Sequence, residues 1–254
     1  MRTTFLLSAL ALIATSACSV PSVSAAAGYA RMSIDGRLGY VNGRSATSVD
    51  QDIESAFGLG DKQGSPYGRA MVDFGVPVLA VSGFSFADSG DGVLEANFGD
   101  SPILIAGTPV HSELDMWNAK TTLAFDIGLG PVTISPGVGV DYFNLDLTVN
   151  DLIGIANENV QLKGPVPIGF LRGQVDLGIV AATAEVGYVE ADVEDVKGKF
   201  LDIEALVTVR PKPWLDLFVG YRSLGLNLDG VIDSDTFNAD ITISGFLAGG
   251  GFTF

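Results

Sequence analysis

Few side chains in this sequence could do covalent chemistry. The one histidine, His111, stands in the run Val110-His111-Ser112-Glu113, which places an imidazole, a hydroxyl and a carboxylate close together along the chain. A hydrolase needs a nucleophile, a base and an orienting group that converge in space. Neighbouring residues of a strand point to opposite faces, so this run does not build that arrangement. We therefore expect no catalytic residue and a protein that is not an enzyme.

Acidic clusters are the oxygen ligands that a metal ion could use. Calcium prefers carboxylate oxygens, and Asp229, Asp233 and Asp235 are weak candidates for such a site, although they do not follow an EF-hand loop. A solvated acidic rim explains them better. We expect no bound metal and no cofactor, and we keep the hypothesis that divalent cations bridge the acidic loops to anionic lipid head groups, such as those of lipopolysaccharide.

The overall composition excludes several classes of protein. Lys and Arg number 14 against 30 Asp and Glu, a net charge of −16. Nucleic-acid binding needs clustered positive charge, so we expect no nucleic-acid partner. One cysteine excludes an intramolecular disulfide framework and a Cys-rich zinc site. Beyond the N-terminal segment, no stretch reaches the roughly 18 unbroken apolar residues of a membrane helix.

The N-terminal segment has the features of an export signal. Arg2 precedes the apolar run 5–17, and Val23-Ser24-Ala25 offers small residues at the usual cleavage positions. We assign residues 1–26 to a cleaved signal peptide and residues 27–254 to one domain. Cys18 could be a lipidated residue, but Thr15 stands where a lipoprotein signal favours leucine. We expect Cys18 to be removed with the signal.

Beyond that segment, apolar residues alternate with polar or small ones. This period of two predicts strands rather than helices. Very short turns alternate with longer polar loops, as in an outer-membrane barrel. We predict an all-β fold, a transmembrane antiparallel up-and-down β-barrel of about ten strands, with eight to twelve allowed. The strands are expected near 29–41, 67–76, 78–88, 113–129, 131–147, 164–177, 179–193, 198–210, 213–227 and 237–254.

In such a barrel the apolar face of each strand contacts lipid and the polar face lines the lumen. The apolar set of the first strand is Met32, Ile34, Leu38 and Tyr40. The charged residues on the opposite parity form a predicted lumen network of opposite charges: Asp35, Arg37, Arg69, Asp73, Lys120, Asp126, Asp141, Arg172, Asp176, Glu185, Asp202, Glu204, Arg210, Asp216 and Arg222, with Asp240 on the same parity.

Aromatic residues supply two further signals. Trp117, Tyr142, Tyr188, Trp214 and Tyr221 lie near predicted strand ends, where membrane interfaces favour amphipathic rings. The last strand ends in Phe252 and Phe254. A terminal aromatic of this kind resembles the C-terminal signal that the barrel assembly machinery of bacteria recognises, so we expect that partner, together with outer-membrane lipids and lipopolysaccharide.

Three local features are less regular. The alternation changes phase near Tyr142-Phe143 and again between Ile243 and Phe252, which predicts a bulge or a glycine kink at each place. Val49, Ile53 and Phe57 are spaced by four and predict one short amphipathic helix within 42–66. Residues 93–106 could form a loop hairpin.

An ordered set of short motifs resembles a known family. The motifs are 52–61 (DIESAFGLGD), 112–116 (SELDM), 164–167 (GPVP) and 220–224 (GYRSL), followed by an acidic loop and a last strand that ends in Phe. This order is similar to a family of small, functionally uncharacterised outer-membrane β-barrel proteins of Gram-negative bacteria. The resemblance implies the cell outer membrane as the location, and it brings no activity or catalytic residue.

Lumen width decides between the remaining functions. Eight strands are filled by their own side chains, whereas sixteen leave an aqueous channel. Ten strands therefore favour a mostly filled polar lumen and a structural or surface-interaction role. The first alternative is a narrow, cation-preferring, porin-like channel. The second is a soluble, secreted β-sandwich that acts as a binding module.

Overall fold

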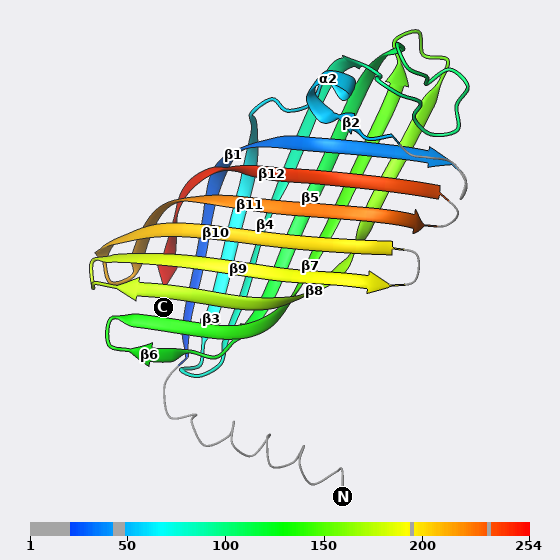
Figure 1. The fold of residues 1–254 in the computed structure, drawn as a ribbon. Coiled ribbons are helices and arrows are strands. Elements are labelled where there is room, and N and C mark those ends of the chain that lie inside the picture. Colours follow the sequence, from blue (N-terminus) through cyan, green and yellow to red (C-terminus); the bar gives the residue numbers. More distant parts are fainter. Residues whose placement is uncertain (1–20, 43–48, 194–195, 233–234) are drawn as a thin grey trace, which may run out of the picture.

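The described part of the chain consists almost entirely of β-strands. The computed structural model describes residues 21–42, 49–193, 196–232 and 235–254 (Figure 1). Its strands are β1 (Ser22–Asn42), β2 (Gln51–Asp52), β3 (Gln63–Asp73), β4 (Val78–Val93), β5 (Pro109–Ala124), β6 (Ile127–Leu129), β7 (Val132–Asp151), β8 (Asn157–Asp176), β9 (Val180–Val193), β10 (Val196–Lys212), β11 (Leu215–Ile232) and β12 (Asp235–Thr253). Helix α2 (Ile53–Phe57) precedes β3.

Ten of these strands close into a ring. Each pairs antiparallel with the next, in the order β1, β3, β4, β5, β7, β8, β9, β10, β11, β12, and β12 returns to pair with β1. Short strands β2 and β6 lie beside β1 and β7. The up-and-down barrel of ten strands is thereby confirmed. Within the described ranges, no helix has both the length and the apolar character to cross a membrane.

The two ends of the barrel differ. We call the end with the tight connections 74–77, 125–131, 177–179 and 213–214 the turn end, and the opposite end the loop end. The C-terminus lies at the turn end, and α2 lies at the loop end (Figure 1). Backbone hydrogen bonds between Val23 and Phe254 join the two termini of the barrel, with N···O distances of 3.1 and 2.8 Å.

Most of the strands are longer than a membrane requires. β1 has 21 residues, and β7 and β8 have 20 each. A transmembrane strand needs about 9–11 residues. About half of each long strand is therefore left over, and the strands extend into segments that the sequence pattern assigned to loops.

The ring separates into two sheets toward the loop end. The β3–β4 ladder stops at Tyr67–Phe84, and the β8–β9 ladder stops at Gly169–Tyr188. At the first break α2 contacts β4, while the backbone N–H of Gly60 and the side chain of Gln63 donate to Asp88, both at 2.8 Å. The break between β3 and β4 is thus covered by the segment that carries α2.

Several local predictions can now be compared with the structure. The short helix within 42–66 is confirmed as α2, whereas 93–106 forms no hairpin, because β4 runs to Val93 and β5 begins at Pro109. A bulge near Tyr142-Phe143 or between Ile243 and Phe252 is wrong, since the ladders run through both places without a shift in register. The alternative, a glycine kink, stays a prediction. The register shift lies elsewhere, in the β10–β11 ladder between Val209 and Lys212.

The predicted signal peptide falls mostly outside the described residues. β1 begins at Ser22, inside the segment assigned to the signal, and its first residues pair with β3 and β12. Removal of residues 1–26 would take away five residues of this strand, Ser22 to Ala26. The cleavage site stays a prediction.

Candidate functional site

An apolar band surrounds the outside of the turn-end half. Outward side chains there are aliphatic and exposed, as at Val138, which is 62% exposed, Leu123, Val207 and Val219. Exposed aromatic residues border the band on both sides. Those toward the loop end are Tyr29, Trp117, Tyr188, Tyr221 and Phe246, with Tyr142 stacked on Trp117 at 5.1 Å, and those at the turn end are Phe74, Phe125, Trp214, Phe252 and Phe254. The five aromatic residues expected near strand ends all lie in these two girdles.

Inside this band, the barrel is filled by charged side chains. The guanidinium of Arg222 lies at its centre and is fully buried. It donates to Asp202 at 2.8 Å and to the amide oxygen of Asn118 at 2.8 Å, and it lies 3.7 Å from Glu204. Asn118 in turn donates to Asp141. Three strands, β5, β10 and β11, and the neighbouring β7 are thereby linked.

A second set of contacts crosses the lumen. Arg69 on β3 pairs with Glu185 on β9 and, at 2.6 Å, with Glu204 on β10. Lys120 on β5 lies 3.1 Å from Asp202 and 3.5 Å from Glu185. The Tyr67 hydroxyl donates to Glu204 at 3.0 Å. Strands on opposite sides of the ring are therefore held together by charge-assisted hydrogen bonds, which are stronger than neutral ones.

Other predicted lumen residues lie toward the turn end. Arg172 donates to Asp126 at 2.8 Å. Arg210 lies 2.6 Å from Asp176 and 3.4 Å from Asp216. Together with Asp73, whose carboxylate accepts from the N–H of Gly75, these residues are only partly buried, apart from the buried Arg172. They form the polar rim at the turn end.

Asp35 and Arg37 do not point into the lumen. They are exposed on the outer face of β1, as is Asp240 on β12, and Arg37 donates to the backbone oxygen of Asp50 at 2.7 Å. The inward residues of this stretch are Ile34 and Leu38, which are buried. The alternation of apolar and polar residues along β1 was identified correctly. The apolar face was predicted to contact lipid, however, whereas in this part of the strand it faces the interior of the barrel.

The loop-end half has an apolar interior. Inward residues there form one buried cluster that includes Met32, Ile34, Leu38, Met116, Phe143, Leu145, Leu162, Phe200, Leu224 and Leu226. Phe57 of α2 packs edge-on against Phe98 of the 94–108 loop, with 5.1 Å between ring centroids, and both rings are buried. Helix and loop thus close the top of this core.

The outside of the loop-end half is polar. Exposed outward residues include Asp115 on β5, Asn159 and Lys163 on β8, and Lys199 on β10. Such a surface suits water and not hydrocarbon. The polarity of the wall therefore reverses along the barrel, and the phase change at Tyr142-Phe143 is this reversal.

The candidate chemical residues lie on that polar surface. His111 Nδ1 is 2.7 Å from Asp91 Oδ1, and its Nε2 is 3.6 Å from Glu113, which shares its outer face. Ser112 points inward and is buried, as the opposite-face argument expects. Asp229 accepts from Asn238 at 3.1 Å, whereas the Asp233 and Asp235 side chains lie outside the described part. No group of three or more metal-ligating side chains occurs among the described residues.

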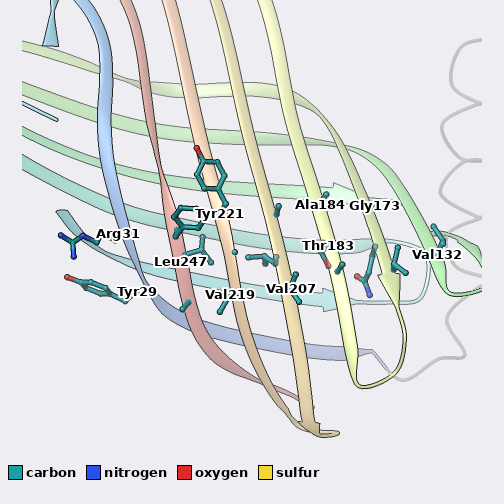
Figure 2. Close-up of a pocket in the computed structure, with 18 residues that line it drawn as sticks. Tyr29, Arg31, Val132, Gly173, Thr183, Ala184, Val207, Val219, Tyr221 and Leu247 are labelled. Atoms are coloured by element: carbon teal, nitrogen blue, oxygen red, sulfur yellow. The ribbon is translucent and has the colours of Figure 1, made fainter. Parts of the chain in front are cut away.

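The apolar band contains a shallow groove of about 950 Å³. Figure 2 shows labelled lining residues on strands that follow one another around the barrel, from Tyr29 on β1 to Gly173 on β8 and Val132 on β7. The groove exists because several outward positions carry small residues, among them Ala182, Ala205 and Ala248. The groove is open to the outside of the barrel, within the apolar band itself.

Comparisons with known proteins agree with this fold. No family model matches the chain, and no curated protein matches its sequence. Among solved structures, the outer membrane protease OmpT of Escherichia coli matches with a TM-score of 0.59 and 10% identity, over 92% of this chain and 97% of that one. Ail of Yersinia pestis (TM-score 0.37, 10% identity, 93% and 100%) and the toluene transporter TodX of Pseudomonas putida (0.32, 8%, 94% and 91%) are more distant.

The OmpT match supports the resemblance to outer-membrane barrels at the level of the fold, while the finer family is not found. At 10% identity the OmpT match says nothing about activity. With its closed ring, apolar band and two aromatic girdles, the chain has the fold of a Gram-negative outer-membrane β-barrel.

Proposed function

We propose that this protein is a non-enzymatic outer-membrane barrel that does not conduct, and that its loop end is a folded surface outside the cell for contact with partners. The observation that carries the proposal is the continuous apolar core inside the loop-end half, which α2 and the 94–108 loop cover. Water and ions entering from the turn end meet this core after the salt-bridge network.

The orientation follows from the ends of the strands. Outer-membrane barrels place short turns in the periplasm and longer loops outside. The turn end would then lie in the periplasm, and the polar wall above the girdle would stand in the medium or among the head groups of lipopolysaccharide.

The aromatic residues at the end of β12 fit insertion into the outer membrane by the barrel assembly machinery. Phe252 and Phe254 are 49% and 80% exposed, and Phe252 stacks on Trp214 with 6.0 Å between ring centroids. Exposed terminal rings at the closing strand are accessible to the barrel assembly machinery. Replacing Phe254 with Ser should lower the amount of barrel in the outer membrane without changing refolding of purified protein into detergent.

Single-channel recording in planar bilayers tests the proposal. A silent bilayer is expected after verified insertion, with a sixteen-strand porin as the conducting control. Steady, cation-selective steps would instead establish the narrow channel, since the buried or partly buried lumen residues include five acids (Asp126, Asp141, Glu185, Asp202, Glu204) and four bases (Arg69, Lys120, Arg172, Arg222). Insertion is verified by the migration of unboiled and boiled samples on a denaturing gel.

A further inference from the structure

The break between β8 and β9 is an opening in the barrel wall. Their ladder runs from Asp176–Ala181 to Gly169–Tyr188 and no further, although β8 continues to Asn157 and β9 to Val193. On its other side, β8 stays paired with β7 throughout. The two strands therefore separate at the level of the girdle residue Tyr188, although β9 stays paired with β10 there. The other break in the wall, between β3 and β4, is covered by the segment that carries α2.

Two prolines explain why the ladder ends at this position. Continuing the register of Gly169–Tyr188 would bring Pro167 opposite Glu190 and Pro165 opposite Asp192. In the β7–β8 ladder, Pro165 pairs with Tyr142 and Pro167 with Val140. A proline can occupy such a ladder only where its backbone hydrogen-bonding groups point away from the partner strand, so at positions 165 and 167 these groups face β9. Proline has no N–H to donate. Each of the next two pairs toward β9 would therefore lack one of its two hydrogen bonds, so the sequence itself disfavours closure of the wall here.

The opening leads into an apolar slot of about 240 Å³. Pro165, Pro167 and Lys199 line its outer part, and Phe143, Val166, Val189, Phe200, Leu226 and Leu228 line its inner part. The inner residues belong to the apolar core of the loop-end half or pack against it. The slot thus connects the outside of the wall, just above the girdle, with the dry interior between the two sheets.

The size and position of the slot restrict what can enter it. Drug-sized sites measure about 300–1,000 Å³, so this one suits a slender molecule and not a helix or a ring system. Its mouth adjoins the apolar band, where hydrocarbon chains are the abundant apolar matter. Lys199 at the mouth is exposed and only loosely paired, with its Nζ 3.8 Å from Glu190. A cation at the entrance to an apolar slot complements an acidic head on an aliphatic chain.

We propose that the opening between β8 and β9 is a lateral binding site for the chain of a long-chain carboxylate, which enters from the outer leaflet and places its carboxylate near Lys199. The site goes beyond the proposed non-conducting barrel, because the chain enters through the wall and does not cross the lumen.

Two variants close the site in different ways. Gly198 lines the slot, and a Cβ there would lie 3.0 Å from the flexible Leu228 side chain, so Gly198→Trp fills the space. Pro165→Thr with Pro167→Thr supplies two N–H groups and lets the β8–β9 ladder continue. Pro136→Thr is the matched control, because Pro136 is an exposed strand proline on β7 that does not line the slot.

The probe is stearate with a nitroxide on its chain, added to the protein in phosphatidylcholine vesicles. We expect an immobilised spectral component in the natural protein and in P136T, and about a ten-fold or greater loss of affinity in G198W and in the double variant, a difference of about 1.4 kcal/mol or more. Lys199→Gln should weaken stearate but not its nitroxide-labelled methyl ester.

Equal immobilisation in all four proteins, each shown to be folded by its migration on an unboiled gel, would overturn the proposal, because ordinary lipid contact with the wall would then explain the signal. That result would leave the silent bilayer of the proposed function untouched. Conducting steps together with stearate binding that depends on the slot would overturn the proposed non-conducting function and would support the lateral site.

Discussion

Two inward positions on β11, Arg222 and Leu224, summarise the difference between the halves of this barrel. Both are buried, yet one lies in a network of ion pairs and the other in an apolar core. The outward neighbours show the reverse, because Tyr221 belongs to the girdle of the apolar band and Asn227 is a polar, exposed residue of the loop-end half. The outer face of one strand thus suits hydrocarbon in the turn-end half and water in the loop-end half. In hydrocarbon the polar side must face inward, and in water the apolar side must.

The largest expected effect comes from breaking the charged half. Arg222→Leu removes one of the two cations beside each of Asp202 and Glu204 and leaves the buried network with an excess of negative charge. Removing one member of a buried pair costs about 3–5 kcal/mol. We expect this loss in the free energy of unfolding measured in lipid vesicles. Adding Asp202→Asn should restore part of it, since one uncompensated charge disappears.

The matching change in the other half is Leu224→Ala. It should cost about 2–5 kcal/mol through the cavity it leaves, and Asp202→Asn should not restore any of that loss. Rescue of both variants by D202N, or of neither, would contradict the assignment of these neighbours to different environments.

A second comparison uses two outward positions on β5. Leu123 lies in the apolar band and Asp115 on the polar wall. Leu123→Arg should cost about 1–3 kcal/mol, between the penalties for arginine at an interface and at mid-bilayer, because Leu123 lies two residues from Phe125 of the turn-end girdle. Asp115→Arg should change stability by at most about 0.5 kcal/mol and could gain from Asp146, its partner on β7. Similar penalties at both positions would place both in the same solvent.

The smallest effect concerns pH at the loop end. Asp52 caps α2, accepting backbone N–H groups of Ser55 at 2.9 Å and Glu54 at 3.1 Å, and these bonds lower the pKa of its carboxyl below the ordinary 3.8. Because the folded pKa is the lower one, the cap's stability is fully present above the unfolded value and is lost as pH falls through the folded value.

Amide exchange of residues 53–58, corrected for the intrinsic rate at each pH, measures this effect. The corrected exchange rate should be constant from neutral pH to about pH 5. It should rise below pH 3.8, the ordinary pKa of the carboxyl. Asp52→Ala should cost about 1 kcal/mol of local stability and remove the pH dependence. A variant that keeps the natural profile would show that another carboxyl controls α2.

The strand pattern predicted the topology well for a physical reason. Alternation and turn signals are local, so ten strands and α2 could be read from the sequence. The side of the sheet that faces inward is not local, because it depends on the solvent outside. Asp35 and Arg37 were placed in the lumen for that reason, whereas Arg69, Glu185 and Asp202, within the apolar band, were placed correctly.

Two other features were within reach of the sequence but were interpreted differently. The phase change at Tyr142-Phe143 was interpreted as a bulge or a glycine kink, although a swap of the apolar face produces the same pattern. Pro165 and Pro167 were noted only as part of a motif. A strand with prolines at alternate positions has no N–H groups to donate on that side, which favours an unpaired edge. The cross-lumen partners, such as Arg69 with Glu204, depend on barrel closure and could not be predicted from local pattern.

The central claim is that hydrocarbon touches only the turn-end half of the wall. Nitroxide labels on Val138→Cys and Thr148→Cys, in a chain with Cys18→Ser, test it most directly, since both positions face outward on β7. In lipid vesicles we expect the label at 138 to collide with oxygen and be shielded from a water-soluble nickel chelate, and the label at 148 to behave in the opposite way. Shielding from the chelate at both positions would contradict the reversal of polarity along the barrel.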